Sequence, residues 1–166
     1  MMHPTRTTMT LDSLPVLPSI SLSQLQQEAA FLTRKDRKYI VPTADLVELL
    51  TGVEAGTRAL EIDSRRTFGY STRYFDEGHT AYFRALRQRS NRFKVRTRRY
   101  DDSGECQLEI KLMDARGNTV KSRFPHTSGD LETLSALDRA WLGSFDAVRP
   151  VAGQLAPSVA THYHRS

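Results

Sequence analysis

Three stretches in the middle of the chain alternate between apolar and polar residues, which is the period of β-strands with one buried face. They cover residues 91–100, 105–113 and 118–124. Turn sequences at residues 101–104 and 114–118 separate them, and Pro125 ends the third. Asp, Asn, Ser and Gly between short strands favour hairpins. The pattern therefore predicts an antiparallel meander of three strands.

The alternation also predicts which side chains share a face, because successive residues of a strand point to opposite sides of the sheet. One face carries the apolar residues Phe93, Val95, Leu108, Ile110, Leu112, Val120 and Phe124. The opposite face carries polar residues that are mainly cationic: Arg92, Lys94, Arg96, Arg98, Tyr100, Gln107, Glu109, Lys111, Lys121 and Arg123. We expect helices to cover the apolar face, so that the other face is open to water or lines a concave or tubular interior.

The rest of the chain predicts flanking helices and further strands. Apolar residues recur at helical spacing in five places, at residues 21–32, 44–50, 80–89, 130–137 and 140–145. Strand-forming residues gather at residues 34–41, 66–76 and 158–165. Ser21 and Thr43 are the expected N-caps of the first two helices. Residues 1–20 are expected to form a flexible leader and residues 146–157 a loop, which places the folded domain at residues 21–166.

The length of 166 residues and the hydrophobic content of 39% fit one globular domain. The single cysteine, Cys106, excludes an internal disulfide framework and a zinc site built from several cysteines. No apolar run reaches the roughly 20 residues that span a bilayer, and the first residues lack a secretion signal. These features predict a soluble cytoplasmic protein.

The basic residues are concentrated in one part of the chain. The formal net charge is +5, but residues 84–99 contain eight Arg and Lys and no acidic residue, so that the rest of the chain carries a formal −3. A solvated basic face would explain such a segment. A solubilising face usually mixes both signs, however, and the strand pattern gathers mainly one sign. We therefore expect a polyanionic partner, since phosphate oxygens suit the geometry of Arg and Lys.

Glu109 is the acidic residue among the cationic positions of the three strands. Two roles are open to it. It would act as an internal counter-ion that orients Lys111, or as a carboxylate ligand to magnesium or manganese, which commonly bridge protein carboxylates and phosphates.

Five short motifs follow one another at a characteristic spacing. They are RKYIVP at residues 37–42, YFD at 74–76, FKVRTRRY at 93–100, LEIK at 108–111 and VK at 120–121. Their order resembles the VTC domain, the polyphosphate polymerase domain of vacuolar transporter chaperone proteins and their bacterial relatives. This domain lies in the triphosphate tunnel metalloenzyme, or CYTH-like, superfamily. The resemblance covers residues 34–165 and implies a closed antiparallel tunnel lined by Lys and Arg.

The resemblance also implies a phosphate-binding set drawn from several strands: Lys38, Arg96, Arg98, Lys111, Lys121 and Arg165. Strand parity adds Arg123 to this set. Arg96, Arg98 and Lys111 are the catalytic candidates, because phosphoryl transfer depends on positioning and on neutralisation of charge. Members of the family use Mn²⁺ or Mg²⁺, for which Glu109 is the candidate ligand.

The family pattern continues beyond the position of Arg165 with further basic strands and a metal-holding glutamate, whereas this sequence stops at Ser166. The resemblance therefore predicts an α+β fold with flanking helices and an incomplete antiparallel β tunnel of the triphosphate-tunnel type, truncated at its C-terminal side. A truncated product, a partner chain that completes the tunnel, and a binding remnant are the three explanations. The expected function is binding of inorganic polyphosphate or nucleoside triphosphate. A completed tunnel would act as a phosphotransferase that moves the ATP terminal phosphoryl group to a polyphosphate chain, or as a triphosphatase.

A module that binds RNA or single-stranded nucleic acid is the alternative. Such modules combine basic residues with aromatic rings that stack on bases, and Tyr82, Phe83, Phe93 and Tyr100 are candidates. Parity places Phe93 on the face opposite to Lys94, which would put stacking and charge on different sides of the sheet there. Competition between short polyphosphate and labelled RNA would separate the two hypotheses.

Overall fold

The computed structural model describes residues 17–29, 39–42, 45–87, 89, 92–113 and 119–165. The chain forms two compact units, one of residues 1–66 together with residue 166 and one of residues 67–165. The second unit contains all three alternating stretches of the sequence. Within the described ranges, the helices are too short or too polar to cross a membrane.

The first unit contains β1 (Ser19–Ile20), α1 (Leu22–Ala29), α2 (Leu46–Thr51) and β2 (Ala59–Leu60). The expected N-cap of α1 is confirmed, because the Ser21 hydroxyl accepts the Gln24 backbone N–H at 3.2 Å. β1, which ends the expected leader, pairs in parallel with β2. Of the strand expected at residues 34–41, residues 39–41 are neither helix nor strand, and the remainder lies outside the described residues, as does Thr43.

The second unit begins with β3 (Phe68–Asp76) and α3 (Thr80–Leu86). The meander follows as β4 (Arg92–Tyr100), β5 (Cys106–Met113) and β6 (Thr119–Pro125). The chain then forms α4 (Ala136–Gly143), a short 3₁₀ turn η3 (Arg149–Val151) and β7 (Ala156–Arg165). β4, β5 and β6 lie close to the ranges that the alternation predicts, and β3 and β7 lie close to the stretches of strand-forming residues at 66–76 and 158–165.

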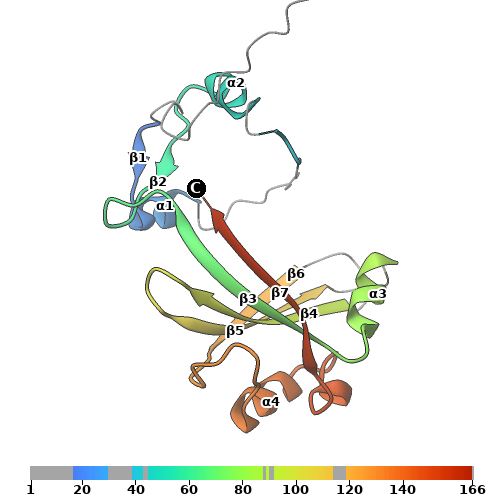
Figure 1. Ribbon diagram of the computed structural model, residues 1–166. Helices are drawn as coiled ribbons and strands as arrows, with labels where there is room; N and C mark the ends of the chain where they lie inside the picture. Colours follow the sequence, from blue (N-terminus) through green and yellow to red (C-terminus); the bar gives the residue numbers. More distant parts are fainter. Residues whose placement is uncertain are drawn as a thin grey trace, which may run out of the picture. The chain divides into compact units, whose positions relative to one another are not determined.

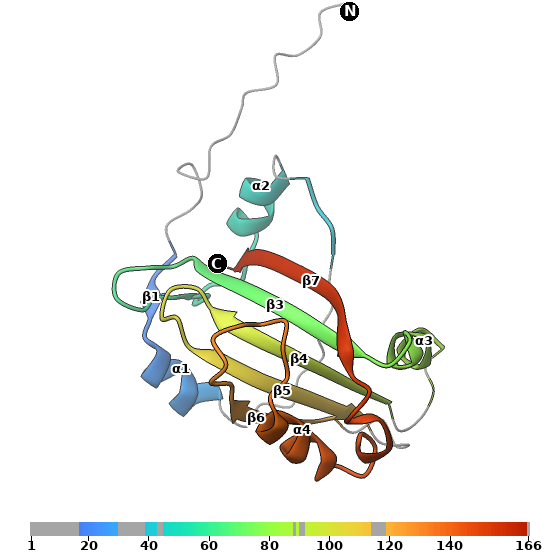
Figure 2. The same ribbon diagram turned by 60° about the horizontal axis from the view of Figure 1, so that its bottom comes forward.

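The strands of the second unit form one antiparallel sheet in the order β6-β5-β4-β3-β7. The three-strand meander is confirmed, and β7 returns along β3 to lie beside it, as the red and green strands of Figures 1 and 2 show. The resemblance implies a tunnel, but the described strands do not close one. In the part of the chain that the structure describes, β6 pairs only with β5 and β7 only with β3, so the sheet is open at both edges.

The apolar face of the sheet is covered as expected. Val95, Leu108 and Ile110 are at most 1% exposed and pack in one core with residues of the C-terminal segment, among them Leu142 of α4 and Val148. Figure 2 shows α4 against this side of the sheet. Phe93 is buried in the same core, whereas Val120, near the start of edge strand β6, is exposed. Burial of one face leaves the other face of β4 and β5 available for charged side chains.

The segment before α4 departs from the sequence prediction of two helices. Residues 131–135 contain no helix because the Asp130 carboxylate accepts the Glu132 backbone N–H at 2.9 Å and the Thr133 hydroxyl at 2.7 Å, which favours a turn. The helix begins only after Ser135, whose side chain forms a capping box with Asp138. One helix, α4, therefore replaces the two.

Candidate functional site

The register of the sheet brings the predicted cations together on one face. One row of directly opposed residues across β4, β5 and β6 is Lys94, Lys111 and Lys121. The next row is Arg96, Glu109 and Arg123. Directly opposed residues have Cβ atoms about 5 Å apart, so these side chains are neighbours. We call the face that carries Lys94, Arg96, Arg98, Lys111, Lys121 and Arg123 the cationic face.

Glu109 lies at the centre of the cationic face with its side chain 2% exposed. Its Oε2 accepts the Arg96 Nε–H at 2.7 Å and lies 2.5 Å from Arg96 Nη2. Its Oε1 lies 2.7 Å from Lys121 Nζ and 3.1 Å from Arg123 Nε. The role of internal counter-ion expected from the sequence thus has a structural basis, but its partners are these three cations and not Lys111.

The ionisation of this cluster follows from its contacts. Burial alone would raise the pKa of Glu109, but the Lys121 ammonium and the Arg96 guanidinium together hold that pKa below its ordinary value. Burial lowers the pKa of Lys121, an effect that its contact with Glu109 opposes without cancelling. Burial also opposes the charge of Arg96, yet Glu109 and the Tyr74 hydroxyl leave the pKa of Arg96 raised. The carboxylate is therefore ionised at neutral pH, surrounded by cations.

Arg98 is buried on the same face, at 9% exposure, and tyrosines surround its guanidinium. Its Nε–H donates to Thr72 Oγ1 at 3.1 Å and its Nη2 donates to the Tyr163 hydroxyl at 2.9 Å. The Tyr70 ring centroid lies 5.2 Å from its Cζ, and that of Tyr163 lies 5.7 Å away, both within cation–π distance. Within the described residues, no carboxylate forms an ion pair with Arg98. A buried cation whose partners are neutral favours the approach of an anion.

Lys94 and Lys111 are exposed and stand directly opposite each other. No ion pair with a carboxylate involves either lysine among the residues that the structure describes. Like charges at directly opposed positions destabilise a sheet, and they repel by about 1 kcal/mol at 4 Å even in water. An anion that bridges the two ammonium groups would relieve this repulsion.

Of the remaining predicted site residues, the structure describes Arg165 but not Lys38. Arg165 ends β7 opposite Phe68, two positions along from Tyr163, so it lies on the side of the sheet that faces Arg98. Lys38 lies outside the described residues. The sites predicted at Arg96, Arg98, Lys111, Lys121 and Arg123 lie on neighbouring strands of one face.

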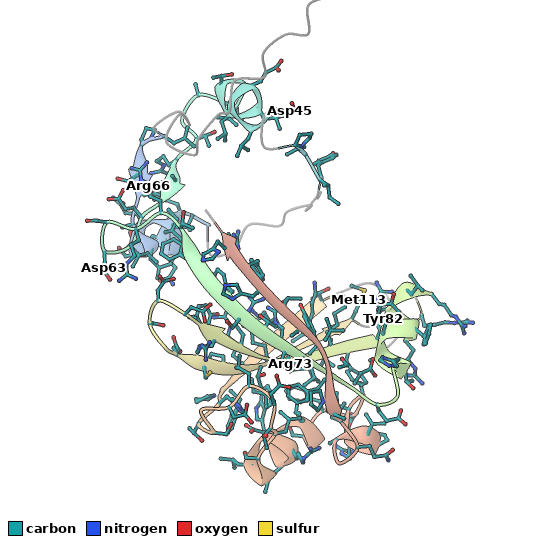
Figure 3. The ribbon with its side chains drawn as sticks, viewed as in Figure 1. Asp45, Asp63, Arg66, Arg73, Tyr82 and Met113 are labelled. Atoms are coloured by element: carbon teal, nitrogen blue, oxygen red, sulfur yellow. The ribbon has the colours of Figure 1, made fainter. Side chains whose placement is uncertain are left out.

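The side chains from β3 are residues that the sequence analysis missed. Tyr70, Thr72 and Tyr74 alternate along β3 and are paired with residues of β4 that belong to the cationic side. Arg73, labelled in Figure 3, points the other way and forms an ion pair with Glu132 in the segment before α4. The sequence signal for these residues is the same alternation within residues 66–76. It shows which residues share a face, but only the pairing of β3 with β4 shows that this is the cationic side.

A divalent metal fits poorly at Glu109. Both carboxylate oxygens are already bound to Arg96, Lys121 or Arg123, so a metal ion there would face three positive charges. Magnesium and manganese also take several oxygen ligands, and the described residues hold no group of three or more Asp, Glu, His or Cys side chains arranged for a metal. We therefore derive no role for a metal at this carboxylate.

A pocket of about 680 Å³ lies where α3 meets the sheet, and its lining includes Phe75, Phe93 and Val95 of the apolar core as well as Lys94 of the cationic face. Lys94 and Tyr74 border it on the sheet side, and Tyr82, labelled in Figure 3, and Leu86 border it on α3. Asp76 also lines it, but its carboxylate accepts the backbone N–H groups of residues 77, 81 and 82 at the start of α3. The pocket is thus mainly apolar, with Lys94 among the residues that line it.

Comparison with protein-family models gives one finding. The VTC domain model matches residues 33–166, which is most of the chain and includes the whole cationic face. Searches of curated proteins and of solved structures find no match.

Proposed function

Because the chain belongs to the VTC domain family, we propose that it binds inorganic polyphosphate or nucleoside triphosphate on the cationic face. The family is tied to polyphosphate synthesis, and its members act on phosphate substrates and usually use divalent metals. The proposal for this chain concerns the ligand and the residues that bind it.

One observation carries the proposal. Three neighbouring strands, β4, β5 and β6, point the six residues of the cationic face and also Arg92 to one side, and Glu109 is the single carboxylate within those strands. The excess charge is concentrated on a short sheet, at a cost that linked phosphates would remove. Arg and Lys are the side chains that recognise phosphate oxygens, Arg through its planar fork of donors and Lys as a point charge.

The contacts indicate which cations of the cationic face are available to a ligand and which are already paired with Glu109. Lys94 and Lys111 have no carboxylate partner among the described residues, so their ammonium groups are open to a first phosphate group. Arg98 also lacks a carboxylate partner among these residues, although its Nε and Nη2 already donate to the neutral Thr72 and Tyr163 side chains. Arg96 and Lys121 already share Glu109. In a phosphoryl transfer, Arg96, Arg98 and Lys111 would hold the chain of phosphates in line and neutralise the charge on the transferred group.

The pocket beside α3 supports nucleoside triphosphate as one ligand. It is apolar, includes the aromatic residues Tyr74 and Tyr82, and reaches the lysine row at Lys94. A planar base in this pocket would place its phosphates toward Lys111. ATP is then expected to bind more tightly than tripolyphosphate, and Leu86→Arg, which fills the pocket, is expected to remove that difference while leaving tripolyphosphate binding in place.

Single-stranded nucleic acid is the second candidate, because the structure shows tyrosines on the cationic side. Tyr70, Tyr100 and Tyr163 cluster there, with Tyr70 stacked on Tyr163 at a centroid distance of 5.3 Å. Their rings contact one another and Arg98, however, which leaves less ring surface for bases. Displacement of labelled RNA by short polyphosphate at low concentration would favour polyphosphate, and the reverse would favour RNA.

The direct test uses Lys94→Met with Lys111→Met. Isothermal titration calorimetry with polyphosphate at fixed ionic strength should show at least about tenfold weaker binding, because two phosphate contacts are lost. The matched control is Arg99→Met with Arg149→Met, which removes the same charge from two exposed residues outside the cationic face. If both double variants lost polyphosphate affinity equally, the loss would follow from the change in net charge alone, and the proposed site would be rejected.

A further inference from the structure

The buried carboxylate of Glu109 forms ion pairs with side chains of the two strands that flank its own. It comes from β5, and the cations that it contacts come from β4 on one side and β6 on the other. Its side chain is 2% exposed, whereas those of Lys121 and Arg123 are 37% and 57% exposed. The anion is therefore deep and the cations reach from it toward the surface of the cationic face.

We propose that Glu109 is an internal counter-ion that occupies Arg96, Lys121 and Arg123 until the phosphates of a ligand take its place, and that it does not hold a divalent metal. This inference rests on the proposed function, since it needs a phosphate ligand on this face. Glu109 is a positioning residue here, because it acts through the three cations.

The first argument is that the carboxylate and a phosphate use the same donors. Arg96 presents Nε and Nη2 to Glu109, and Lys121 presents its ammonium. Charge-assisted hydrogen bonds of this kind form equally with phosphate oxygens. A bound phosphate chain must therefore compete with Glu109 for these cations or share them with it.

The second argument concerns the protein without ligand. Arg96 and Arg123 are both directly opposed to Glu109, and Lys121 is diagonal to it. Without an anion among them, three cations would crowd within one small area of sheet and repel one another. Glu109 removes much of this repulsion, and a ligand that supplies several negative charges would make it dispensable.

The third argument separates this role from metal binding. Arg96, Lys121 and Arg123 already contact both oxygens of Glu109, and no further carboxylate stands on β4, β5 or β6 to complete a ligand set. A divalent ion at this point would have to displace the cations without any gain in oxygen ligands.

The test compares Glu109→Gln with the control Glu132→Gln. The control makes the same change in charge and also breaks one ion pair, that with Arg73, on the opposite face of the sheet. Three quantities are measured for each variant and for the wild-type chain: the thermal midpoint without ligand, the dissociation constant of medium-chain polyphosphate at fixed ionic strength, and Mn²⁺ binding by electron paramagnetic resonance.

We expect Glu109→Gln to lower the thermal midpoint without ligand and to bind polyphosphate about fivefold more tightly, since a competing charge is gone. Polyphosphate should raise its midpoint by more than it raises that of the wild type. A merely structural role would lower the midpoint without tightening binding. Mn²⁺ binding should match the wild type, and Glu132→Gln should leave polyphosphate affinity within about twofold.

Weaker polyphosphate binding by folded Glu109→Gln, or loss of Mn²⁺ binding that the wild type shows, would overturn the inference. If the single variant does not fold, Glu109→Gln with Lys121→Met removes a neutral pair and takes its place. The pair variant should bind polyphosphate about as tightly as the wild type, while Lys121→Met alone binds more weakly; equal losses in both would contradict us. A wild-type chain that does not bind polyphosphate would instead reject the proposed function.

Discussion

Arg98→Met is the substitution that best separates binding from stability. Most buried residues at the centre of a sheet cannot be changed without loss of stability, but Arg98 is a buried cation whose hydrogen-bond partners, Thr72 and Tyr163, are neutral. We predict that Arg98→Met leaves the stability of the protein almost unchanged and strongly weakens polyphosphate binding. Such a result would identify Arg98 as a residue that contributes to ligand binding and very little to stability.

The magnitudes follow from the contacts. Arg98→Met removes two hydrogen bonds of a charged donor, worth about 1.5–3 kcal/mol each, and two ring contacts worth about 1 kcal/mol each. It also removes the burial of a charge without a counter-ion, which costs several kcal/mol. These terms nearly cancel, so the free energy of unfolding should change by no more than about 1 kcal/mol. The lost phosphate contact is charge-assisted and worth about 1.5–3 kcal/mol, or roughly 10- to 150-fold in affinity.

Urea unfolding followed by circular dichroism measures the first quantity, and calorimetric titration with polyphosphate at constant ionic strength measures the second. Arg99→Met is the control, because Arg99 neighbours Arg98 on β4 but is exposed and pairs with Asp101. A destabilisation of Arg98→Met by more than about 3 kcal/mol would mean that Arg98 is a structural residue and that the cancellation above is wrong. Equal polyphosphate affinities of Arg98→Met and the wild type would show that Arg98 does not contact the ligand.

Three further outcomes are expected. Arg96→Ala with Arg98→Ala should abolish polyphosphate binding and keep the circular dichroism spectrum of the wild type; unchanged affinity in a salt-controlled assay would count against the site. The contacts of Glu109 hold its pKa below the ordinary value of about 4.3, so Glu109 should stabilise the fold above that pH and lose this contribution as the pH falls through the folded-state pKa. The stability of Glu109→Gln should therefore depend less on pH than that of the wild type between about pH 5 and 2. Parallel pH profiles of the two proteins would refute the assignment. Leu142→Ala, which empties a fully buried position of α4, should cost about 3 kcal/mol in urea unfolding at an unchanged m-value; a cost below about 1 kcal/mol would mean that α4 does not seal the core.

The faces of the sheet could be predicted from the sequence because one rule governs them. Alternation along residues 91–100 and 105–113 separates Val95 and Leu108 from Arg96 and Glu109, and no tertiary information is needed for that separation. The burial of Val95 and Leu108 confirms it. Alternation did not assign Lys38, which came from the family resemblance. The structure does not test that assignment, because Lys38 lies outside the described residues.

The partners of Glu109 could not be predicted in the same way. Glu109 and Lys111 lie two positions apart on one strand, which made Lys111 the expected partner, but the actual contacts cross to neighbouring strands. They depend on register, which the turns and the core packing set together. The open sheet has the same origin, since alternation predicts strands but does not state which edges they close.

The division of β4 into an apolar side and a charged side has a consequence for folding. Slipping β4 by one position against β5 would turn Arg96 and Arg98 toward Leu142 and push Phe93 and Val95 into water. Each misplaced guanidinium would lose its hydration inside a hydrocarbon layer, so such an arrangement is far less stable than the native one. The charges that attract a ligand thereby also enforce a unique alignment of the backbone, and a single-residue insertion in β4 is expected to be far more harmful than an insertion of two.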